Sequence, residues 1–429
     1  MRVKRTFNID QPELFKKQLL AWSQNSEFCV FLDANQHQEA YSSFDAMLAI
    51  GAFTAIKTDT QDAFEQLDEY QKTTQDWLFG YLTYDLKNAV EKLDSKNANP
   101  LNFPDLYFVQ PLKVIQIQGH QVHFLYLKMI DDEIENDFNF ILNQVLEESY
   151  APKNKLQIQS RIHQNEYINA VKSTLKHIER GNIYEANFCM DFYATNSQIN
   201  PLATYLKLNS ISQPPQACYL KFENIHALCA SPERYLKFNQ GLLISQPIKG
   251  TAKRGKTFEE DQILKRELEN DPKEKSENIM IVDLVRNDLS KTASKASVKV
   301  EELCKIYSFQ QVHQMISTIT SKPKVAYSPV ELLKTTFPMG SMTGAPKIAA
   351  MQIMEELESF QRGLYSGSIG YFDPKGNFDF NVIIRSVLYN SKNKTVSYAV
   401  GSAITAASIP EKEYEECLVK AKAMKEVLS

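Results

Sequence analysis

The chain has 429 residues, of which 43% are hydrophobic, and its formal net charge is −4. A chain of this length and composition can bury a large core, so we exclude a disordered polypeptide and expect two or three domains or one large two-lobed unit. The small net charge, without a basic stripe, gives no electrostatic support for binding to nucleic acid.

The sequence also gives no sign of a membrane or secreted protein. No apolar run approaches the roughly 20 residues that cross a bilayer, and the basic start is not followed by an apolar signal-peptide core. The six cysteines are scattered and form no CxxC pair. We therefore expect a cytoplasmic protein with reduced thiols, no disulfide framework and no zinc site.

The first 150 residues mix short strand-like runs with helical stretches. Strands are expected over 28–32, 106–109, 112–117 and 122–127. The polar segment 144–157 is the best linker candidate. We therefore predict an N-terminal lobe over residues 1–150 and a catalytic region over residues 151–429.

The second region alternates strands with long helices. The helix over 163–180 carries apolar residues at helical spacing. Strands are expected over 186–193, 217–222, 227–231, 242–248, 297–300, 366–372, 380–388 and 395–400, and further helices over 258–270, 271–292, 330–335, 347–358 and 410–428. Hairpin-like strands interrupted by helices predict an α+β protein rather than a doubly wound sheet.

A carboxylate follows the expected strand 227–231. Glu233 stands in the segment Ser231-Pro-Glu-Arg234. Ser followed by Pro also begins many helices, so a structural role as a cap stays open. If burial raises the pKa of Glu233, its carboxylic acid can protonate a leaving hydroxyl.

A lysine lies in the next conspicuous segment, Gln246-Pro-Ile-Lys-Gly-Thr251. Lys249 is either a solvated turn residue or an amine nucleophile. An amine must be neutral to attack, and partial burial lowers the pKa of a lysine. The second reading therefore requires Lys249 to be partly buried.

Two pairs of glutamates lie three residues apart on expected helices. Glu274 and Glu277 form the first pair, and Glu413 and Glu416 form the second, with Lys420 one turn further on. Surface carboxylates at this spacing are common, so each pair alone is weak evidence. Two such helices facing each other would form an oxygen-rich Mg²⁺ site that also holds a carboxylate substrate.

A glycine-containing turn over 340–347 precedes one helix. Small residues, including Ser341 and Gly344, let the backbone approach a ligand. Pro346 begins the helix, whose free N–H groups favour an anion. An ordinary turn with Thr343 as a cap also fits these residues.

Arg385 lies within the expected strand 380–388, at the end of its apolar part 380–384. Its planar guanidinium can hold a carboxylate with two hydrogen bonds. A structural salt bridge explains an arginine at this position equally well. Position alone does not separate the two.

Taken together in this order, these segments resemble the chorismate-utilising enzymes, a family that includes anthranilate, aminodeoxychorismate, isochorismate and salicylate synthases. The matching strings are SPERYL, PIKGT, ENIMIVDLVRNDLS, FPMGSMTGAPK, SGSIGYF, IIRSV and EYEECLVKAKA, over residues 160–428. The first 150 residues match less clearly, through GYLTYD at 80–85. The resemblance implies the fold of anthranilate synthase component I, in which large antiparallel sheets form a sandwich with outer helices.

The resemblance also implies roles for single residues. Glu233 corresponds to the general acid. Glu277 and Glu416 correspond to Mg²⁺ ligands, supported directly or through water by Glu274 and Glu413. The candidates for binding the substrate are Ser341, Thr343, Gly344, Tyr365, Arg385, Gly401 and Lys420.

One position separates two subgroups of the family. Anthranilate synthases usually carry PIAGT where this chain and the aminodeoxychorismate synthases carry PIKGT. Lys249 therefore resembles the nucleophile that adds to C-2 of chorismate as the C-4 hydroxyl leaves, after which ammonia adds at C-4 and expels the lysine. The implied reaction is Mg²⁺-dependent amination of chorismate to 4-amino-4-deoxychorismate, towards 4-aminobenzoate and folate. The alternative is anthranilate synthase component I, which forms anthranilate and pyruvate.

Three positions depart from the family pattern. Glu185 stands where the aminating members commonly have Gln and the isochorismate and salicylate synthases have Lys, which argues against addition of water at C-2. Gln314 stands where a His is common, with His313 adjacent, and residues 401–403 replace a more glycine-rich turn. We find no counterpart of the tryptophan-sensing motif of anthranilate synthase. We expect ammonia from a separate glutamine amidotransferase subunit, because no Cys lies in a glycine-rich nucleophile turn.

Overall fold

The structure is a computed structural model that describes residues 2–37, 41–146, 156–309 and 312–429. Its first part contains β1 (Arg2–Asn8), α1 (Pro12–Trp22), β2 (Phe28–Asp33), β3 (Ala46–Thr58), α2 (Ala63–Thr74), β4 (Leu78–Leu82), α3 (Lys87–Val90), β5 (Leu106–Gln118), β6 (Gln121–Leu127) and α4 (Ile134–Leu142). The middle part contains β7 (Gln159–Ser160), α5 (Gln164–Glu179), β8 (Glu185–Ala194), α6 (Pro201–Ser212), β9 (Gln216–Phe222), β10 (Ile225–Ser231), β11 (Arg234–Asn239), β12 (Leu242–Gln246) and β13 (Ile248–Lys253). The last part contains α7 (Phe258–Asn270), α8 (Pro272–Ser290), β14 (Lys299–Ser308), β15 (Val312–Ser321), α9 (Pro329–Thr336), β16 (Gly344–Ala345), α10 (Lys347–Leu357), β17 (Ser368–Phe372), β18 (Phe378–Asn381), β19 (Ser386–Asn390), β20 (Thr395–Thr405) and α11 (Pro410–Val427).

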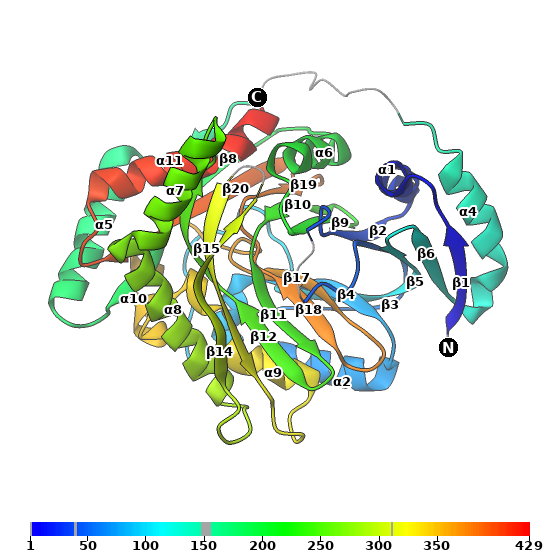
Figure 1. Cartoon of the computed structure of the whole chain (residues 1–429), viewed down its shortest axis with the longest axis horizontal. Helices are drawn as coiled ribbons and strands as arrows, with labels where there is room; N and C mark the ends of the chain where they lie inside the picture. Colours follow the sequence, from blue (N-terminus) through cyan, green and yellow to red (C-terminus); the bar gives the residue numbers. More distant parts are fainter. Residues whose placement is uncertain (1, 38–40, 147–155, 310–311) are drawn as a thin grey trace.

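The strands form one large antiparallel sheet that spans both parts of the chain. Strand β2 pairs with β9, and β4 pairs with β17, so strands from the first 150 residues lie between later strands. The boundary predicted at residue 150 falls within 147–155, outside the described residues. Figure 1 shows α1 and α4 beside β1 and β6 on one side, and α5, α7, α8, α10 and α11 on the other. The predicted α+β class is confirmed.

The hydrophobic core has two parts, on opposite faces of the sheet. Successive strand residues point to opposite faces, and on β9 Leu220 belongs to the first part whereas Tyr219 belongs to the second. Strand residues dominate the first part, where the rings of Phe108 and Phe380 lie 6.1 Å apart. Helical residues such as Met424 on α11 cover the second part. This arrangement agrees with the expected fold of large antiparallel sheet and outer helices.

Several elements differ from the expectations. The two strands expected over 106–117 are one strand, because Pro111 lies opposite Ala52 at a β-bulge of β3, where a missing N–H is tolerated. The strand expected over 380–388 is broken into β18 and β19. Strand β15 was not expected, because its inward residues include buried polar side chains such as Ser317 and Thr318, which hide the apolar periodicity. No helix in the described part of the chain is both long and apolar enough to cross a membrane.

Candidate active site

A cavity of about 420 Å³ lies where β13 and β20 meet α8 and α11. Most of the predicted site residues line it, although they come from distant parts of the sequence. These residues are Glu233, Lys249, Glu274, Glu277, Ser341, Tyr365, Arg385, Gly401, Glu413, Glu416 and Lys420. The long-range strand pairing therefore assembles one site from segments that the sequence shows only separately.

Glu233 lies in the short connection between β10 and β11. Its backbone amide donates a hydrogen bond to the hydroxyl of Ser231 (3.1 Å), so Ser231 stabilises a bend rather than the start of a helix. The side chain is buried, and a hydrogen bond links it to Ser341. Burial raises the pKa of Glu233 to about 7, against the weaker opposite effects of Ser341 and Lys249. Near neutral pH the carboxyl group can therefore carry a proton for donation.

Lys249 lies on β13, so the reading of it as a solvated turn residue does not hold. Its Nζ is 3.0 Å from Oε1 of Glu185 at the start of β8. Burial acts to lower the pKa of Lys249, but the negative charges nearby, that of Glu185 foremost, outweigh burial and raise the pKa above its ordinary value. The expectation of a lowered pKa for Lys249 is therefore wrong, because burial is only one of the two opposing effects. The lysine is an ammonium ion in the free protein, and it must lose a proton before it can attack.

The two acidic pairs face each other across the cavity. Glu274 and Glu277 lie on α8, and Glu413 and Glu416 lie on α11. The Nζ of Lys273 is 3.6 Å from Oε1 of Glu277 and 3.6 Å from Oε1 of Glu413. Burial raises the pKa of Glu277 to about 7, and its Oε1 is buried without a hydrogen-bond donor in the described structure. Carboxylate oxygens held around a positive charge suit a hard cation such as Mg²⁺, although among the described residues no three metal-ligating side chains converge into a complete site.

Two basic residues, Arg385 and Lys420, line the cavity beside the acidic pairs, and we call them the basic wall. Arg385 lies between β18 and β19 with a left-handed backbone (φ 53°), and its Nη1 donates to the carbonyl oxygen of Lys420 (3.4 Å). No carboxylate of the described residues pairs with Arg385, and burial lowers its pKa. Lys420 donates to the carbonyl oxygen of Gly401 (2.9 Å) and pairs with Glu416 (2.6 Å). A partly buried guanidinium that pairs with no described carboxylate is suited to a ligand carboxylate.

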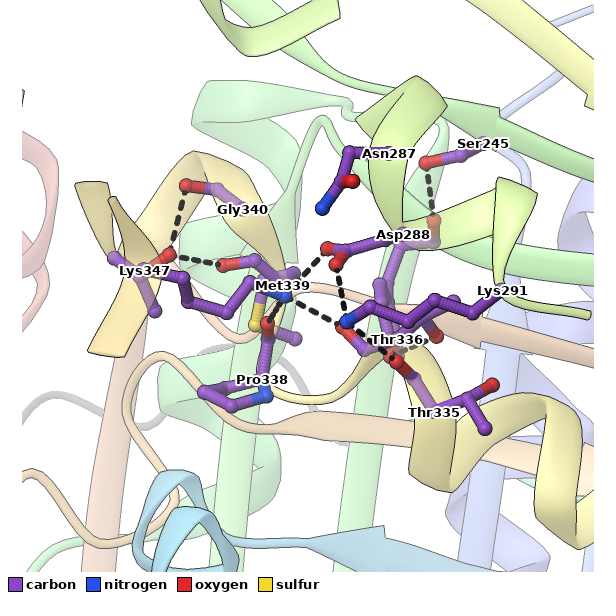
Figure 2. Close-up of polar contacts among 12 residues, drawn as sticks. Ser245, Asn287, Asp288, Lys291, Thr335, Thr336, Pro338, Met339, Gly340 and Lys347 are labelled. Carbon is purple, nitrogen blue, oxygen red and sulfur yellow. Dashed lines mark hydrogen bonds and ion pairs between the residues drawn. The ribbon is translucent and has the colours of Figure 1, made fainter. Parts of the chain in front are cut away.

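The turn that precedes α10 is fixed to α8 by Lys347 (Figure 2). Its ammonium group pairs with Asp288 and donates to the carbonyl oxygens of Thr336 (3.0 Å) and Pro338 (2.9 Å). Lys291 donates to the other oxygen of Asp288 (2.9 Å). The lysine that begins α10 therefore points away from the cavity, and its polar contacts hold the turn in position.

Two predicted substrate-binding residues, Thr343 and Gly344, do not line the cavity. The hydroxyl of Thr343 donates within its own turn, to the carbonyl oxygen of Gly340 (3.1 Å). Gly344 lies against β8, where a Cβ atom would lie 2.2 Å from the carbonyl oxygen of Glu185. The glycine is thus required by the approach of the turn to β8, and Ser341 is the residue of this turn that faces the cavity.

Several cavity residues were not assigned from the sequence. Lys253 lines the cavity together with Lys249 and Thr251, which is the spacing of one face of a strand. That signal is visible only once residues 248–253 are known to be a strand. Lys273 and Gln314 also line the cavity, and Oε1 of Gln314 is buried without a donor among the described residues. The sequence marks Gln314 only as a departure from the family pattern, and no local pattern distinguishes Lys273.

The chorismate binding enzyme family matches residues 26–426 of this chain, and the chain belongs to that family. An aminodeoxychorismate synthase of Arabidopsis thaliana is 37% identical over 83% of this chain, which spans 41% of that relative. The aminodeoxychorismate synthase component 1 of Bacillus subtilis is 30% identical over 88% of this chain and 80% of the relative. The anthranilate synthase component 1 of Aquifex aeolicus is 33% identical over 81% of this chain and 73% of the relative. The solved structure of anthranilate synthase component I from Streptococcus pneumoniae superposes with a TM-score of 0.78 at 24% identity, over 91% of this chain and 94% of that chain. That superposition supports the expected fold.

Proposed function

We propose that this protein aminates chorismate with ammonia to give 4-amino-4-deoxychorismate, in a Mg²⁺-dependent reaction of 4-aminobenzoate and folate synthesis. The observation that carries the proposal is the position of Lys249. This lysine lines the same cavity as Glu233, at the sequence position that separates the two aminating subgroups. Two of the relatives are named aminodeoxychorismate synthase, in agreement with this assignment.

Glu233 is the proposed acid. Hydroxide is a poor leaving group, so the C-4 oxygen must receive a proton as its bond to the ring breaks. A carboxyl group with a pKa of about 7 is partly protonated at neutral pH and can supply that proton. The hydrogen bond with Ser341 holds the group at the cavity wall.

The proposed magnesium ligands are Glu277 and Glu416, with Glu274 and Glu413 as direct or water-mediated support. Carboxylates from two helices fit this ion, and Lys273 already brings a positive charge between two of them. The metal would supply charge that neutralises a carboxylate of the substrate. The chain's own contribution is to hold these oxygens on two helices that pack on the same sheet.

The basic wall is proposed to hold the other end of the substrate. Chorismate carries two carboxylates, and the guanidinium of Arg385 and the ammonium of Lys420, which lies one turn beyond Glu416 on α11, line the same cavity as the acidic pairs. Tyr365 and Gly401 line the same cavity. An anion with two carboxylates is therefore matched by a site with one cationic wall and one wall that can take a metal ion.

Anthranilate synthase component I is the second candidate, because relatives with that name are similarly close. Product analysis with chorismate, Mg²⁺ and ammonium separates the two functions. The proposed function predicts an aminated product that retains its pyruvyl group, with no release of pyruvate. Fluorescent anthranilate with one equivalent of pyruvate would support the second candidate instead.

The source of ammonia is also part of the proposal. We propose that a separate glutamine amidotransferase subunit delivers it in the cytoplasm. In the purified chain, ammonium salts should replace that subunit.

A further inference from the structure

The contact between Glu185 and Lys249 has a feature that a simple ion pair does not require. Glu185 is buried, and its Oε1 lies 3.0 Å from Nζ of Lys249. Its other oxygen, Oε2, is buried without a hydrogen-bond donor among the described residues. A buried carboxylate oxygen without a donor is costly to stability. A functional role for this carboxylate would explain why that cost is tolerated.

The backbone holds Glu185 in place from two sides. Strand β8 pairs with β20, where Glu185 lies opposite Thr405, and with β16, where it lies opposite Ala345. Lys249 lies on β13, which pairs with β15 on either side of the lysine, at Ile248 and at Thr251. The carboxylate and the amine are therefore positioned by the sheet before any substrate is bound.

The chemistry requires an acceptor for the proton of Lys249, and this chain has a carboxylate beside the amine where aminating members of the family commonly have Gln. An ammonium ion has no lone pair, so Lys249 must pass a proton to another group before it can bond to carbon. Glu233 must carry a proton for the leaving oxygen and cannot take another. Among the described residues, Glu185 is the carboxylate within hydrogen-bond distance of the amine.

We propose that Glu185 is the general base that takes the proton from Lys249. This inference rests on the proposed function, in which Lys249 is the nucleophile. The proton moves from Nζ to a carboxylate oxygen of Glu185, and the lone pair that is left forms the bond from Nζ to C-2. Both ring double bonds shift, the C-4–O bond breaks, and the oxygen leaves as water with the proton of Glu233.

The second half of the reaction returns Lys249 and Glu185 to their starting protonation states. The nitrogen of ammonia bonds to C-4, both double bonds shift back, and the bond from C-2 to Nζ breaks with its electrons on nitrogen. The amine then regains its proton from Glu185, and Glu233 is reprotonated from ammonium or solvent. Ammonium and chorismate give the aminated product and water, with no oxidant or reductant.

The test compares adduct formation in the full chain and in Glu185→Gln. Glutamine keeps the shape and can still accept a hydrogen bond from Lys249, but it cannot take the proton. Chorismate and Mg²⁺ are mixed with each protein without ammonia, and the adduct is followed by rapid quenching and intact-protein mass spectrometry. We expect adduct formation to slow by about 10²-fold or more, with chorismate affinity changed by less than about threefold. Glu185→Asp should restore part of the rate, because it restores the base.

A matched control lies on the same strand. Asp191 is also a buried carboxylate of β8, paired with Arg161 (2.9 Å), and it does not line the active-site cavity. Asp191→Asn should lose an ion pair without slowing the adduct. If Glu185→Gln forms the adduct at the wild-type rate, the role of Glu185 is overturned while the covalent route stands. An Asp variant that is no faster than the Gln variant would overturn the same role. Amination by the wild-type protein without any adduct would overturn both the covalent route and this inference.

Discussion

The Nζ of Lys273 on α8 lies 3.6 Å from Oε1 of Glu413 on α11, so the two acidic helices meet across a positive charge. The same ammonium lies 3.6 Å from Glu277. A metal ion at this place would compete with the lysine for the same oxygens. The acidic pairs therefore give the most direct test of the proposed cofactor.

Changing Glu277 or Glu416 to Gln should weaken binding of Mg²⁺ and of chorismate together. A neutral amide is a poorer ligand for a hard cation, and a loss of about tenfold or more in each affinity is expected. Isothermal titration calorimetry measures both. The control is Glu415→Gln, which changes an exposed carboxylate on α11, the helix that carries Glu416. A variant with unchanged Mg²⁺ dependence identifies a residue that does not bind the metal.

Arg385→Lys should reduce kcat/KM by about tenfold or more, corresponding to about 1.4 kcal/mol of lost binding. The change keeps the charge but removes the planar pair of donors that matches a carboxylate. Steady-state kinetics with varied chorismate measure the loss. Arg286→Lys, an exposed arginine on α8, serves as the control. Equal kinetics for Arg385→Lys and the wild-type protein would show that Arg385 does not bind substrate.

The pKa of Glu233 predicts how the chemistry depends on pH. Burial raises this pKa to about 7, so the acid form is present below pH 7 and is lost as the pH rises. Adduct formation should therefore fall by about tenfold per unit of pH well above 7. The rate is best measured without ammonia, whose own protonation changes with pH, and with saturating Mg²⁺, because the pKa of Glu277 is also raised to about 7. Glu233→Gln should form the adduct slowly, and its rate should not show this fall above pH 7. If the fall persists in the variant, it arises from another group.

The purified chain should be active with ammonium salts and inactive with glutamine alone. The reason is that no amidotransferase nucleophile motif was found in its sequence. The measurement is product formation with each nitrogen source at equal concentration. Sustained turnover with glutamine would contradict the prediction and place an amidotransferase activity in this chain.

Much of the fold follows from local pattern. The helix over 164–179 was predicted within one residue at each end, because its apolar residues recur at helical spacing and Gly181-Asn182 follows it. The pairing of β2 with β9 could not be predicted, since register between strands distant in sequence depends on packing of the whole sheet. The same limit applies to β15, whose buried polar residues carry no apolar alternation.

The residues of the candidate site also divide into those that a local sequence pattern predicts and those that depend on long-range packing. The glutamate pairs at 274–277 and 413–416 could be identified because helical spacing places each pair on one face. Gly344 illustrates the opposite case, because its small size is needed against Glu185 of β8, a contact that no local pattern predicts. The protonation of Lys249 was predicted in the wrong direction, since burial was weighed without its buried carboxylate partner.

The central claim is that Lys249 becomes covalently bonded to the substrate ring. The most direct measurement is intact-protein mass spectrometry after incubation with chorismate and Mg²⁺ in the absence of ammonia, followed by peptide mapping. We predict an added mass of chorismate minus one water, located on the peptide that contains Lys249 and absent from Lys249→Ala. Absence of any adduct, together with amination by Lys249→Arg at close to the wild-type rate, would contradict the claim, because arginine keeps the charge but is not a competent nucleophile.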